Sequence, residues 1–178
     1  MLLVVAATER ELAFVRGAET ACCGVGPVEA ALRTAQALAG RDVTALLHVG
    51  LAGARTIDAP ALVLGSEAVY CDVIDEGSSW PRVERVAPDA ALLAAVREAL
   101  PEAHVVPIST SGRIGGGGDV EAMEGFGVLR AAQLAGVPAV ELRAISNAVN
   151  EPDRAKWRVD DAFALLADAL ARLVPALS

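Results

Sequence analysis

A short polar motif directly follows the first apolar segment of the sequence. Residues 2–7 are all apolar, and Thr8-Glu9-Arg10-Glu11 comes next. Thr8 and Glu11 have the spacing of a capping box, in which both side chains bond amides at the start of a helix. A carboxylate at this place can also take a proton from water, which is a poor nucleophile at neutral pH. These residues alone do not distinguish the two roles of Glu11. On a helix, Glu9 would point about half a turn away from Glu11.

Three further polar residues lie where apolar segments end or helices begin. Glu124 stands near the start of an alanine-rich segment, where a negative charge also suits the helix dipole. Arg143 interrupts an apolar segment, so its guanidinium either pairs with a carboxylate such as Glu11 or extends to the surface. Asn147 follows the same segment, and its amide can donate hydrogen bonds but cannot act as an acid. An ordinary turn residue is the alternative interpretation of Asn147.

Apolar segments alternate along the chain with segments of helical periodicity. Strands are predicted over residues 1–7, 44–49, 62–64, 68–71, 104–108 and 138–145. A further short strand is predicted to end at Cys22 and Cys23. Helices are predicted over residues 8–16, 28–39, 88–100, 123–135 and 159–174. Such alternation is typical of a mostly parallel sheet with helices on both faces. We therefore expect an α/β protein with one three-layer αβα domain over residues 1–178.

The polar residues fall on one edge of this predicted sheet. Parallel α/β sheets bind ligands at the carboxyl ends of their strands. Those ends are followed here by residues 8–11, 24–27, 50–54 and 146–150. We expect residues 50–54 to form a loop of small residues whose backbone can approach a ligand closely, with Gly50, Ala52 and Gly53 the important positions. An ordinary turn between a strand and a helix is the alternative.

The composition excludes several classes of partner. The net charge is −8, and the 15 basic residues are 14 arginines and Lys156, without a basic run. Nucleic acid binding depends on cationic patches, so no nucleic acid partner is expected. The apolar runs are far shorter than the roughly 20 residues of a membrane span, and no basic segment precedes the first of them. We therefore expect neither membrane insertion nor a signal peptide.

Cysteine and histidine usage is typical of a protein in the reducing cytoplasm. The chain has three cysteines, and an odd number with Cys22 next to Cys23 cannot form a complete disulfide framework. The two histidines, His48 and His104, show no metal-binding spacing. We expect free thiols, a cytoplasmic location, no metal and no other cofactor.

Five motifs at the predicted strand ends resemble, in their order, the purine nucleoside phosphorylase and methylthioadenosine/adenosylhomocysteine nucleosidase superfamily. They are A-T-E-R-E-L from Ala7, G-V-G-P-V-E-A-A from Gly24, H-V-G-L-A-G-A from His48, V-E-A-M-E-G from Val120 and E-L-R-A-I-S-N from Glu141. Each motif is weak alone, but together they cover nearly the whole chain in the family's order. Three details are similar to the futalosine hydrolase branch, namely V-E-x-M-E-G, R-x-I-S-N and the D-R-x-x-W of Asp153, Arg154 and Trp157.

The resemblance implies a nucleoside phosphorylase-like fold and cleavage of an N-glycosidic bond. Glu11 matches the carboxylate that orients and deprotonates the attacking water. Glu124 matches the carboxylate that accepts hydrogen bonds from the ribose hydroxyls, and such charge-assisted bonds also stabilise a cationic sugar. Met123 would pack on the ribose face. Backbone groups would face the sugar or the water at Gly50, Leu51, Ala52 and Gly53.

Asn147 matches the family's purine-contacting position. The methylthioadenosine enzymes have Asp here, which can pass a proton to the purine N7. An asparagine amide can instead donate to N7 and to a 6-oxo group, so a 6-oxopurine is favoured over adenine. Together with the motifs of the futalosine hydrolase branch, this predicts release of hypoxanthine from futalosine, a reaction of the alternative menaquinone pathway.

Water, rather than phosphate, is the predicted acceptor. Phosphorylases of the superfamily hold phosphate with an Arg-x-Gly-Ser/Thr stretch and further basic residues. The corresponding stretch here is His48-Val49-Gly50-Leu51, with neither an arginine nor a hydroxyl. A phosphate dianion without such partners is costly to bury. Hydrolysis is therefore preferred.

Residues 109–119 depart from the family pattern. Four consecutive glycines stand where relatives have a longer loop and a helix, and we interpret residues 115–118 as a flexible linker across a deletion. They are not a phosphate loop, because no Gly-Lys-Ser/Thr follows. No aromatic residue of this segment can stack on a purine. Phe126 and Trp157 are close in sequence, although packing is the expected role of Trp157.

Two alternatives to a futalosine hydrolase stay open. One is a nucleosidase of the methylthioadenosine type, which Asn147 disfavours. The other is a catalytically silent nucleoside-binding relative, whose pocket the deletion has damaged. The resemblance also implies a homo-oligomer, a dimer or larger, since relatives assemble in this way.

Overall fold

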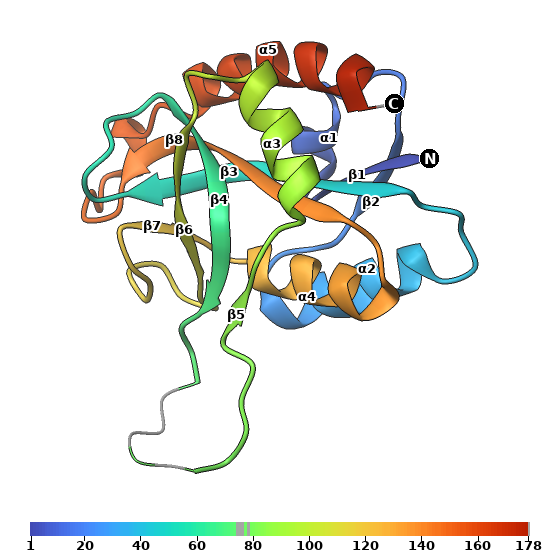
Figure 1. Cartoon of the computed structure of the whole chain (residues 1–178). Helices are drawn as coiled ribbons and strands as arrows, with labels where there is room; N and C mark the ends of the chain where they lie inside the picture. The colour runs from blue at the N-terminus through green and yellow to red at the C-terminus, as the bar shows by residue number, and fades with distance from the viewer. Residues whose placement is uncertain (74–76, 78, 178) are drawn as a thin grey trace.

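The computed structural model describes residues 1–73, 77 and 79–177 and arranges its strands in one mixed sheet (Figure 1). The strands are β1 (Leu2–Ala6), β2 (Glu19–Cys22), β3 (Ala45–Ala54), β4 (Ala61–Tyr70), β5 (Arg85–Val86), β6 (His104–Thr110), β7 (Val120–Ala122) and β8 (Ala139–Ala148). Among the described residues, five strand pairs are parallel and three are antiparallel. The predicted α/β class with a mostly parallel sheet is confirmed.

Five of the strands close into a ring. The strand order is β2-β1-β3-β7-β6-β4-β5, and β8 pairs with both β3 and β4. Strands β3, β7, β6, β4 and β8 therefore follow one another around a closed path, which leaves few exposed edges. One apolar cluster takes residues from all five, namely Ala52, Ala54, Val63, Ile108, Val120, Ala122 and Ile145.

Helices cover both faces of the sheet, as predicted for a three-layer protein. They are α1 (Glu9–Leu12), α2 (Pro27–Leu38), α3 (Ala90–Ala99), α4 (Gly125–Ala135) and α5 (Val159–Leu177), with a short 3-10 helix at Arg154–Lys156. Figure 1 shows α1, α3 and α5 on one face and α2 and α4 on the other. Each face has its own apolar core: Leu170 of α5 belongs to a cluster with Leu142, and Ala30 and Val128 belong to one with Leu3.

Local chemistry sets two of the helix ends. Pro27 is the first residue of α2, where a missing N–H leaves no hydrogen bond unmade. Gly136 ends α4 with a φ of 71°, a left-handed conformation that glycine adopts without steric cost.

Several predicted boundaries are wrong because long-range strand pairing extends the strands. Residues 50–54 are not a loop, since β3 continues through them to Ala54. β8 pairs with β3 from Ala139 to Ala148, and this pairing includes the backbone of residues 50–54. The register of the pairing shifts between Ala52 and Gly53. For the same reason Asn147 lies within β8 rather than in a turn after it.

Other differences concern short or joined elements. Residues 61–70 form the single strand β4, where two shorter strands are predicted. The two-residue β5 and the three-residue β7 have too little pattern to be predicted from sequence. Helix α1 ends at Leu12 instead of continuing to residue 16.

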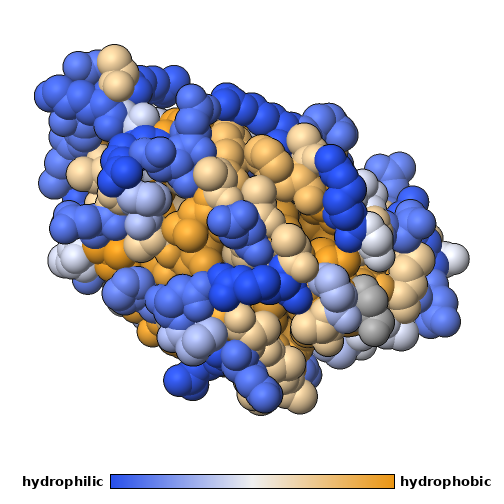
Figure 2. All heavy atoms as spheres, turned by 90° about the horizontal axis from the view of Figure 1, so that it is seen from above, coloured by the Kyte–Doolittle hydropathy of each residue, from blue (hydrophilic) through white to orange (hydrophobic). Residues whose placement is uncertain are grey.

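The surface on the α5 side mixes hydrophilic and apolar residues (Figure 2). Within residues 1–73, 77 and 79–177, no helix combines the length and the apolar character needed to cross a bilayer.

Candidate active site

Two neighbouring cavities bring the predicted site residues together. The first has a volume of about 310 Å³, and its wall includes Glu11, Met123, Glu124 and Arg143. The second has a volume of about 200 Å³, and its wall includes Ala52, Gly53, Glu121, Met123, Asn147 and Trp157. The two cavities share Leu51, Met123 and Val159 as wall residues. The predicted residues thus form one two-part site, although Gly50 lies behind its wall.

Glu11 is both a helix cap and a wall residue of the first cavity. Its Oε2 accepts hydrogen bonds from the Thr8 amide at 2.9 Å and the Thr8 hydroxyl at 2.8 Å, and Thr8 Oγ1 accepts from the Glu11 amide at 3.3 Å. The predicted capping box is therefore present. The second oxygen, Oε1, accepts from the Leu51 amide of β3 at 3.2 Å. The cap holds the carboxylate against β3, so the two interpretations of Glu11 are compatible.

Gly50 explains how Glu11 and Arg143 approach β3 so closely. A Cβ atom at Gly50 would lie 2.6 Å from Glu11 Oε1 and would collide with Arg143 Nη1. Gly50 is buried in the strand, and its φ lies outside the left-handed region. Its role is therefore to leave space for two charged side chains, rather than to form a turn.

Arg143 is the centre of a buried ionic cluster. Its side chain is 1% exposed, and its Nε donates to Glu141 Oε1 at 2.8 Å. Its Nη2 donates to Glu124 Oε2 at 3.3 Å and to His48 Nε2. The prediction that Arg143 pairs with a carboxylate is confirmed. The suggested partner Glu11 is wrong, because the guanidinium reaches Glu141 on its own strand and Glu124 at the start of α4.

Charge compensation keeps Arg143 ionised in the interior. Burial lowers the pKa of Arg143, but the carboxylates of Glu141, Glu124 and Glu11 more than offset this, so its pKa lies above the ordinary value. Burial raises the pKa of Glu141, although Arg143 acts in the opposite direction. Glu141 Oε2 has no hydrogen-bond partner among the described residues. The cluster is therefore costly to bury, and removal of Arg143 would leave two buried carboxylates without their cation.

His48 is a neutral member of this cluster. It is fully buried, and burial together with the Arg143 guanidinium holds the pKa of His48 well below 6.5. Its Nδ1 lies 3.0 Å from the carbonyl oxygen of Val5, which can only accept, so Nδ1 carries the proton. Nε2 is then the acceptor that faces Arg143.

Glu124 lines the first cavity, and Met123 lines both cavities. Glu124 is 4% exposed and makes no side-chain hydrogen bond that caps α4. Its Oε1 accepts instead from the Gly26 amide at 3.1 Å, and its Oε2 faces Arg143. The alternative of a surface acid at a helix start is therefore wrong. Met123 is half-buried and lines both cavities, where it can contact a ligand that spans them.

Asn147 is 8% exposed and lies in the wall of the second cavity. Its Oδ1 accepts from the Ser146 hydroxyl at 2.8 Å, and its Nδ2 donates to the Ala148 carbonyl at 3.1 Å. A Cβ atom at Gly53 would lie 3.1 Å from this Nδ2. The amide is thus held in one orientation beside β3, and its nitrogen has a second N–H for a ligand.

The aromatic residues near the site divide into two kinds. Trp157 is half-buried and lines the second cavity, while its Nε1 donates to the Glu151 carbonyl at 3.1 Å. Its role therefore includes a cavity surface in addition to the predicted packing. Phe126 instead stacks on Tyr70 with ring centroids 5.1 Å apart, and it lines neither cavity.

Residues 115–118 are not the flexible linker that their glycines predict. The Gly115 and Gly117 amides donate to Glu121 at 2.6 and 3.1 Å, and the Gly118 amide donates to Ser109 Oγ at 2.8 Å. Backbone groups of this segment are thus bonded to side chains of β6 and β7, which the sequence does not reveal.

The sequence and the fold are similar to those of known proteins. The sequence model of the phosphorylase superfamily matches residues 18–119. A curated futalosine hydrolase from Streptomyces coelicolor is 35% identical over 192 aligned residues, which cover 90% of this chain and 80% of that protein. The chain belongs to the futalosine hydrolase family of this superfamily. The aligned length exceeds the 178 residues of the chain, so the Streptomyces protein has residues without a counterpart here.

Solved structures share the fold of this family member. The native futalosine hydrolase of Helicobacter pylori strain 26695 has a TM-score of 0.86 at 18% identity, over 99% of this chain and 97% of that chain. The 5'-methylthioadenosine/S-adenosylhomocysteine nucleosidase of H. pylori has the same TM-score at 18% identity, over 99% and 98% of the two chains. At such identities the likeness concerns the fold, and the predicted nucleoside phosphorylase-like architecture is confirmed.

Four residues of this futalosine hydrolase family member were not recognised in the sequence as neighbours of the site. They are His48, Ile114, Glu121 and Glu141. Glu141 could have been recognised from the sequence, because residues two apart in a strand point to the same face and Glu141 precedes Arg143 by two. The other three depend on contacts between distant segments. Within the described parts of the chain, no three His, Cys, Asp or Glu side chains gather as a metal site.

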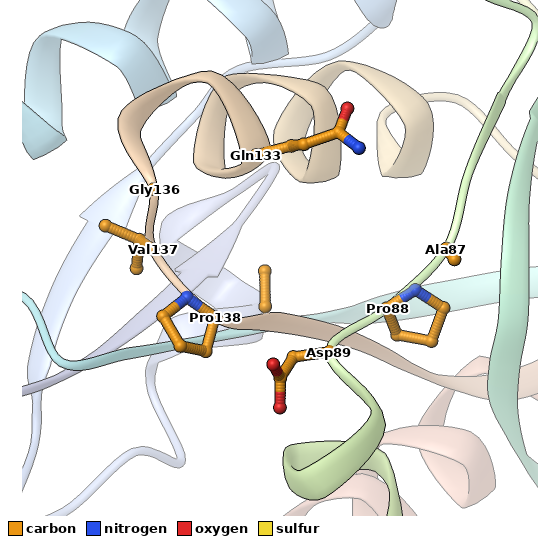
Figure 3. A pocket seen from close by; sticks show the side chains of 8 residues that line it. Ala87, Pro88, Asp89, Gln133, Gly136, Val137 and Pro138 are labelled. Atoms are coloured by element: carbon orange, nitrogen blue, oxygen red, sulfur yellow. The ribbon is translucent and has the colours of Figure 1, made fainter.

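A further cavity lies away from this site (Figure 3). It has a volume of about 260 Å³ and lies beside the end of α4 and the start of β8, with Pro88, Asp89 and Pro138 in its wall. Asp89 accepts a hydrogen bond from the Leu92 amide at 2.9 Å and so caps α3. Since β8 begins here, this cavity lies away from the carboxyl ends of β1, β3 and β8, where ligands of α/β sheets bind.

The buried histidine predicts how stability depends on pH. We expect the free energy of unfolding to fall as the pH drops below about 6.5, because His48 is neutral when folded and gains a proton when unfolded. One such group gives a slope of up to about 1.4 kcal/mol per pH unit. Urea denaturation of the wild type between about pH 7.5 and 5 would measure the slope.

Two variants isolate this contribution. Glu141 acts in the opposite sense, since its raised pKa makes the folded state bind the proton more tightly. Glu141 is present in every variant, so a difference between variants reports only the substituted histidine. His48→Asn should flatten the dependence of the unfolding free energy on pH. His104→Asn, at an exposed position, should leave that dependence unchanged. An unchanged slope in His48→Asn would contradict the prediction.

Proposed function

We propose that this protein hydrolyses the N-glycosidic bond of futalosine and releases hypoxanthine, a step of the alternative menaquinone pathway. One observation carries the proposal. Glu11 and Asn147 lie in two cavities that share wall residues, with the cluster of Glu124 and Arg143 in the first. A nucleoside has a sugar and a base of different chemistry, and this site offers a separate surface for each. The family membership supports the choice of substrate.

Three residues act on the sugar in the proposed mechanism. Glu11 Oε1 orients a water molecule and takes its proton as the water attacks the anomeric carbon. Glu124 accepts hydrogen bonds from the ribose hydroxyls, and its negative charge stabilises the cationic sugar that forms as the bond to the base breaks. Arg143 fixes the position of the Glu124 carboxylate through the contact at 3.3 Å. Met123 packs on the ribose.

Asn147 acts on the base. Its Nδ2 donates to N7 or to the 6-oxo group and so stabilises the negative charge that develops on the leaving purine. The Ser146 hydroxyl at 2.8 Å from Oδ1 favours the amide orientation that this requires. Hypoxanthine presents acceptors at both positions, whereas adenine presents a donor at C6, so the arrangement favours a 6-oxopurine.

The acceptor can be tested together with the reaction itself. We expect purified protein to release hypoxanthine from futalosine at the same rate with and without phosphate, because the stretch His48-Val49-Gly50-Leu51 of β3 has neither an arginine nor a hydroxyl. Liquid chromatography would measure the free base, and phosphorus NMR would detect a sugar 1-phosphate. Such a signal would move the protein to the phosphorylases, and absence of base release from futalosine, inosine and methylthioadenosine would favour the silent relative.

We also propose a homo-oligomer, a dimer or larger, in the cytoplasm. Val25 lies just before α2, Val28 and Leu32 lie on α2, and each of the three is more than half exposed. Val25 also lines the first cavity. Apolar side chains grouped in this way favour contact with another protein surface, and sedimentation velocity would measure the assembly. Cys22, Cys23 and Cys71 are free thiols, which suits a reducing compartment.

A further inference from the structure

Glu141 is a buried carboxylate that the proposed mechanism does not use. It lies within β8, its side chain is fully buried, and it lines neither of the two cavities of the site. Its Oε1 accepts a hydrogen bond from Arg143 Nε at 2.8 Å, and its Oε2 has no hydrogen-bond partner in the part of the chain that the structure describes. Burial of a carboxylate with one oxygen unsatisfied is costly, so the contact with Arg143 is the feature to explain.

A glycine makes room for the Glu141 carboxylate at the start of α4. A Cβ atom at Gly125 would collide with both carboxylate oxygens of Glu141. Gly125 is the first residue of α4, and its φ lies outside the left-handed region, so the space it leaves explains this glycine better than its backbone conformation. Gly50 leaves space for Arg143 in the same way. The Glu141–Arg143 pair is thus accommodated by one glycine on each side.

The bond from Glu141 fixes the direction of the Arg143 guanidinium. The N–H groups of a guanidinium lie in one rigid plane, so an acceptor at Nε determines where the two Nη groups point. Nη2 donates to Glu124 Oε2 at 3.3 Å and to His48 Nε2, and Nη1 donates to the Leu51 carbonyl at 3.4 Å. All three nitrogens of the guanidinium therefore have an acceptor in this one orientation.

Glu11 lies close to this guanidinium without an ion pair to it. A Cβ atom at Gly50 would lie 2.6 Å from Glu11 Oε1 and would collide with Arg143 Nη1, so both groups approach the same glycine. Within the described residues, Arg143 forms ion pairs with Glu124 and Glu141 only. Burial lowers the pKa of Arg143, and Glu11 acts with Glu141 and Glu124 to raise it, so the two charges attract each other across Gly50. A movement of the guanidinium toward Glu11 would close this gap into an ion pair.

We propose that Glu141 is a positioning residue, which holds the Arg143 guanidinium against Glu124 and apart from Glu11. This rests on the proposed function, since it takes Glu11 as the general base. A direct ion pair with Arg143 would favour the ionised form of the Glu11 carboxylate and make it a weaker base. Glu141 therefore keeps Glu11 free to take a proton from water, while Arg143 fixes Glu124 for the ribose.

The charged and titratable neighbours of this site come from several elements besides β8. They are Arg10 of α1, Cys23 after β2, His48 of β3, Glu124 before α4 and Asp160 of α5. Arg10 and Asp160 form an exposed ion pair at 3.0 Å. Burial raises the pKa of Cys23 to about 12, and burial with Arg143 holds the pKa of His48 well below 6.5, so both stay neutral near pH 7. A substitution of Glu141 leaves each of these groups in place, so a pH profile can report the contact between Arg143 and Glu11.

Two conservative variants separate the reach of Glu141 from its charge. Glu141→Gln keeps the length and an accepting oxygen, whereas Glu141→Asp keeps the charge and is shorter by one methylene. With futalosine as substrate, Glu141→Gln should stay within about threefold of the wild type in kcat, and Glu141→Asp should lower kcat about tenfold. In Glu141→Asp, the acidic limb of kcat/KM against pH should also move about one unit to lower pH, because the nearby guanidinium favours the ionised carboxylate of Glu11. Glu141→Gln should leave this limb in place.

Two further variants make the kinetic result decisive. Val96→Ala truncates a buried side chain of α3, so it should lower stability and leave the acidic limb unchanged. Gly125→Ala places a methyl group against the same carboxylate and should move the limb in the same direction as Glu141→Asp, which provides a second test if Glu141→Asp does not fold. An impaired Glu141→Gln beside an active Glu141→Asp would show that charge acts instead of position and would overturn the proposal. Equal effects of the two Glu141 variants would also overturn it.

Crystal structures test the placement of Arg143 independently of catalysis. In Glu141→Asp, a guanidinium nitrogen of Arg143 should lie within about 3.2 Å of a Glu11 carboxylate oxygen. In the wild type and in Glu141→Gln, the two groups should remain apart. If the wild type cleaves no nucleoside but the structures show this movement, the proposed function fails and the positioning of Arg143 by Glu141 stands. An Arg143 side chain that keeps its place in Glu141→Asp would overturn the proposal, whatever the activity.

Discussion

Glu11→Gln should abolish turnover while substrate binding is retained. The glutamine amide cannot take a proton from water, and a general base contributes about 10²–10⁴-fold to the rate. Glutamine keeps one oxygen that can accept from the Thr8 amide or from the Leu51 amide, so the protein should still fold. Steady-state kinetics with futalosine would measure the loss, and calorimetry with the inactive variant would measure binding.

Glu9→Gln is the matched control for this variant. Glu9 lies two residues before Glu11 on the same short helix, but it is exposed and lines neither cavity. It should retain nearly full activity. If the two variants are equally active, Glu11 serves only as a helix cap and the proposed mechanism is wrong.

Asn147 should make futalosine a better substrate than methylthioadenosine by at least about 10²-fold in kcat/KM. Adenine would set its C6 amino group against the Nδ2 group, and a buried mismatch of this kind costs about 1–3 kcal/mol. Sites that recognise a substrate through hydrogen bonds can discriminate by roughly 10⁴ or more in kcat/KM. The expected ratio is therefore a low estimate. Specificity constants for the two nucleosides in the wild type would measure it directly.

Asn147→Asp should reduce this preference. A carboxylic acid can protonate N7 of adenine, whereas the amide can only donate a hydrogen bond, so the relative rate on methylthioadenosine should rise. The contact between Oδ1 and Ser146 Oγ at 2.8 Å can persist in the variant, because an aspartate oxygen also accepts from a hydroxyl. A wild type that prefers methylthioadenosine would refute this interpretation of Asn147 and favour a nucleosidase of the methylthioadenosine type.

The sequence by itself determined the class of fold and pointed to most of the residues that line the two cavities. Apolar periodicity marks the alternation of strands and helices, since burial of one face or both leaves a regular pattern. Local signals also predict the capping box of Thr8 and Glu11 and the end of α4 at Gly136, because these depend on neighbours in the chain. The sequence placed Glu11 and Asn147 after predicted strands, Arg143 within a strand and Glu124 near the start of a helix, and the structure brings them to two adjoining cavities.

Only the tertiary structure decided how these residues are held. β3 continues through residues 50–54 because β8, almost a hundred residues later, satisfies its backbone hydrogen bonds. Arg143 bonds to Glu141 and Glu124 rather than to Glu11, since the packing of α4 against the sheet sets which carboxylate it reaches. Four glycines in a row suggest flexibility from the sequence alone, yet Glu121 and Ser109 accept hydrogen bonds from three of their four amides. Each of these outcomes depends on groups far apart in the chain, and no local pattern records which partner a backbone amide or a buried charge will find.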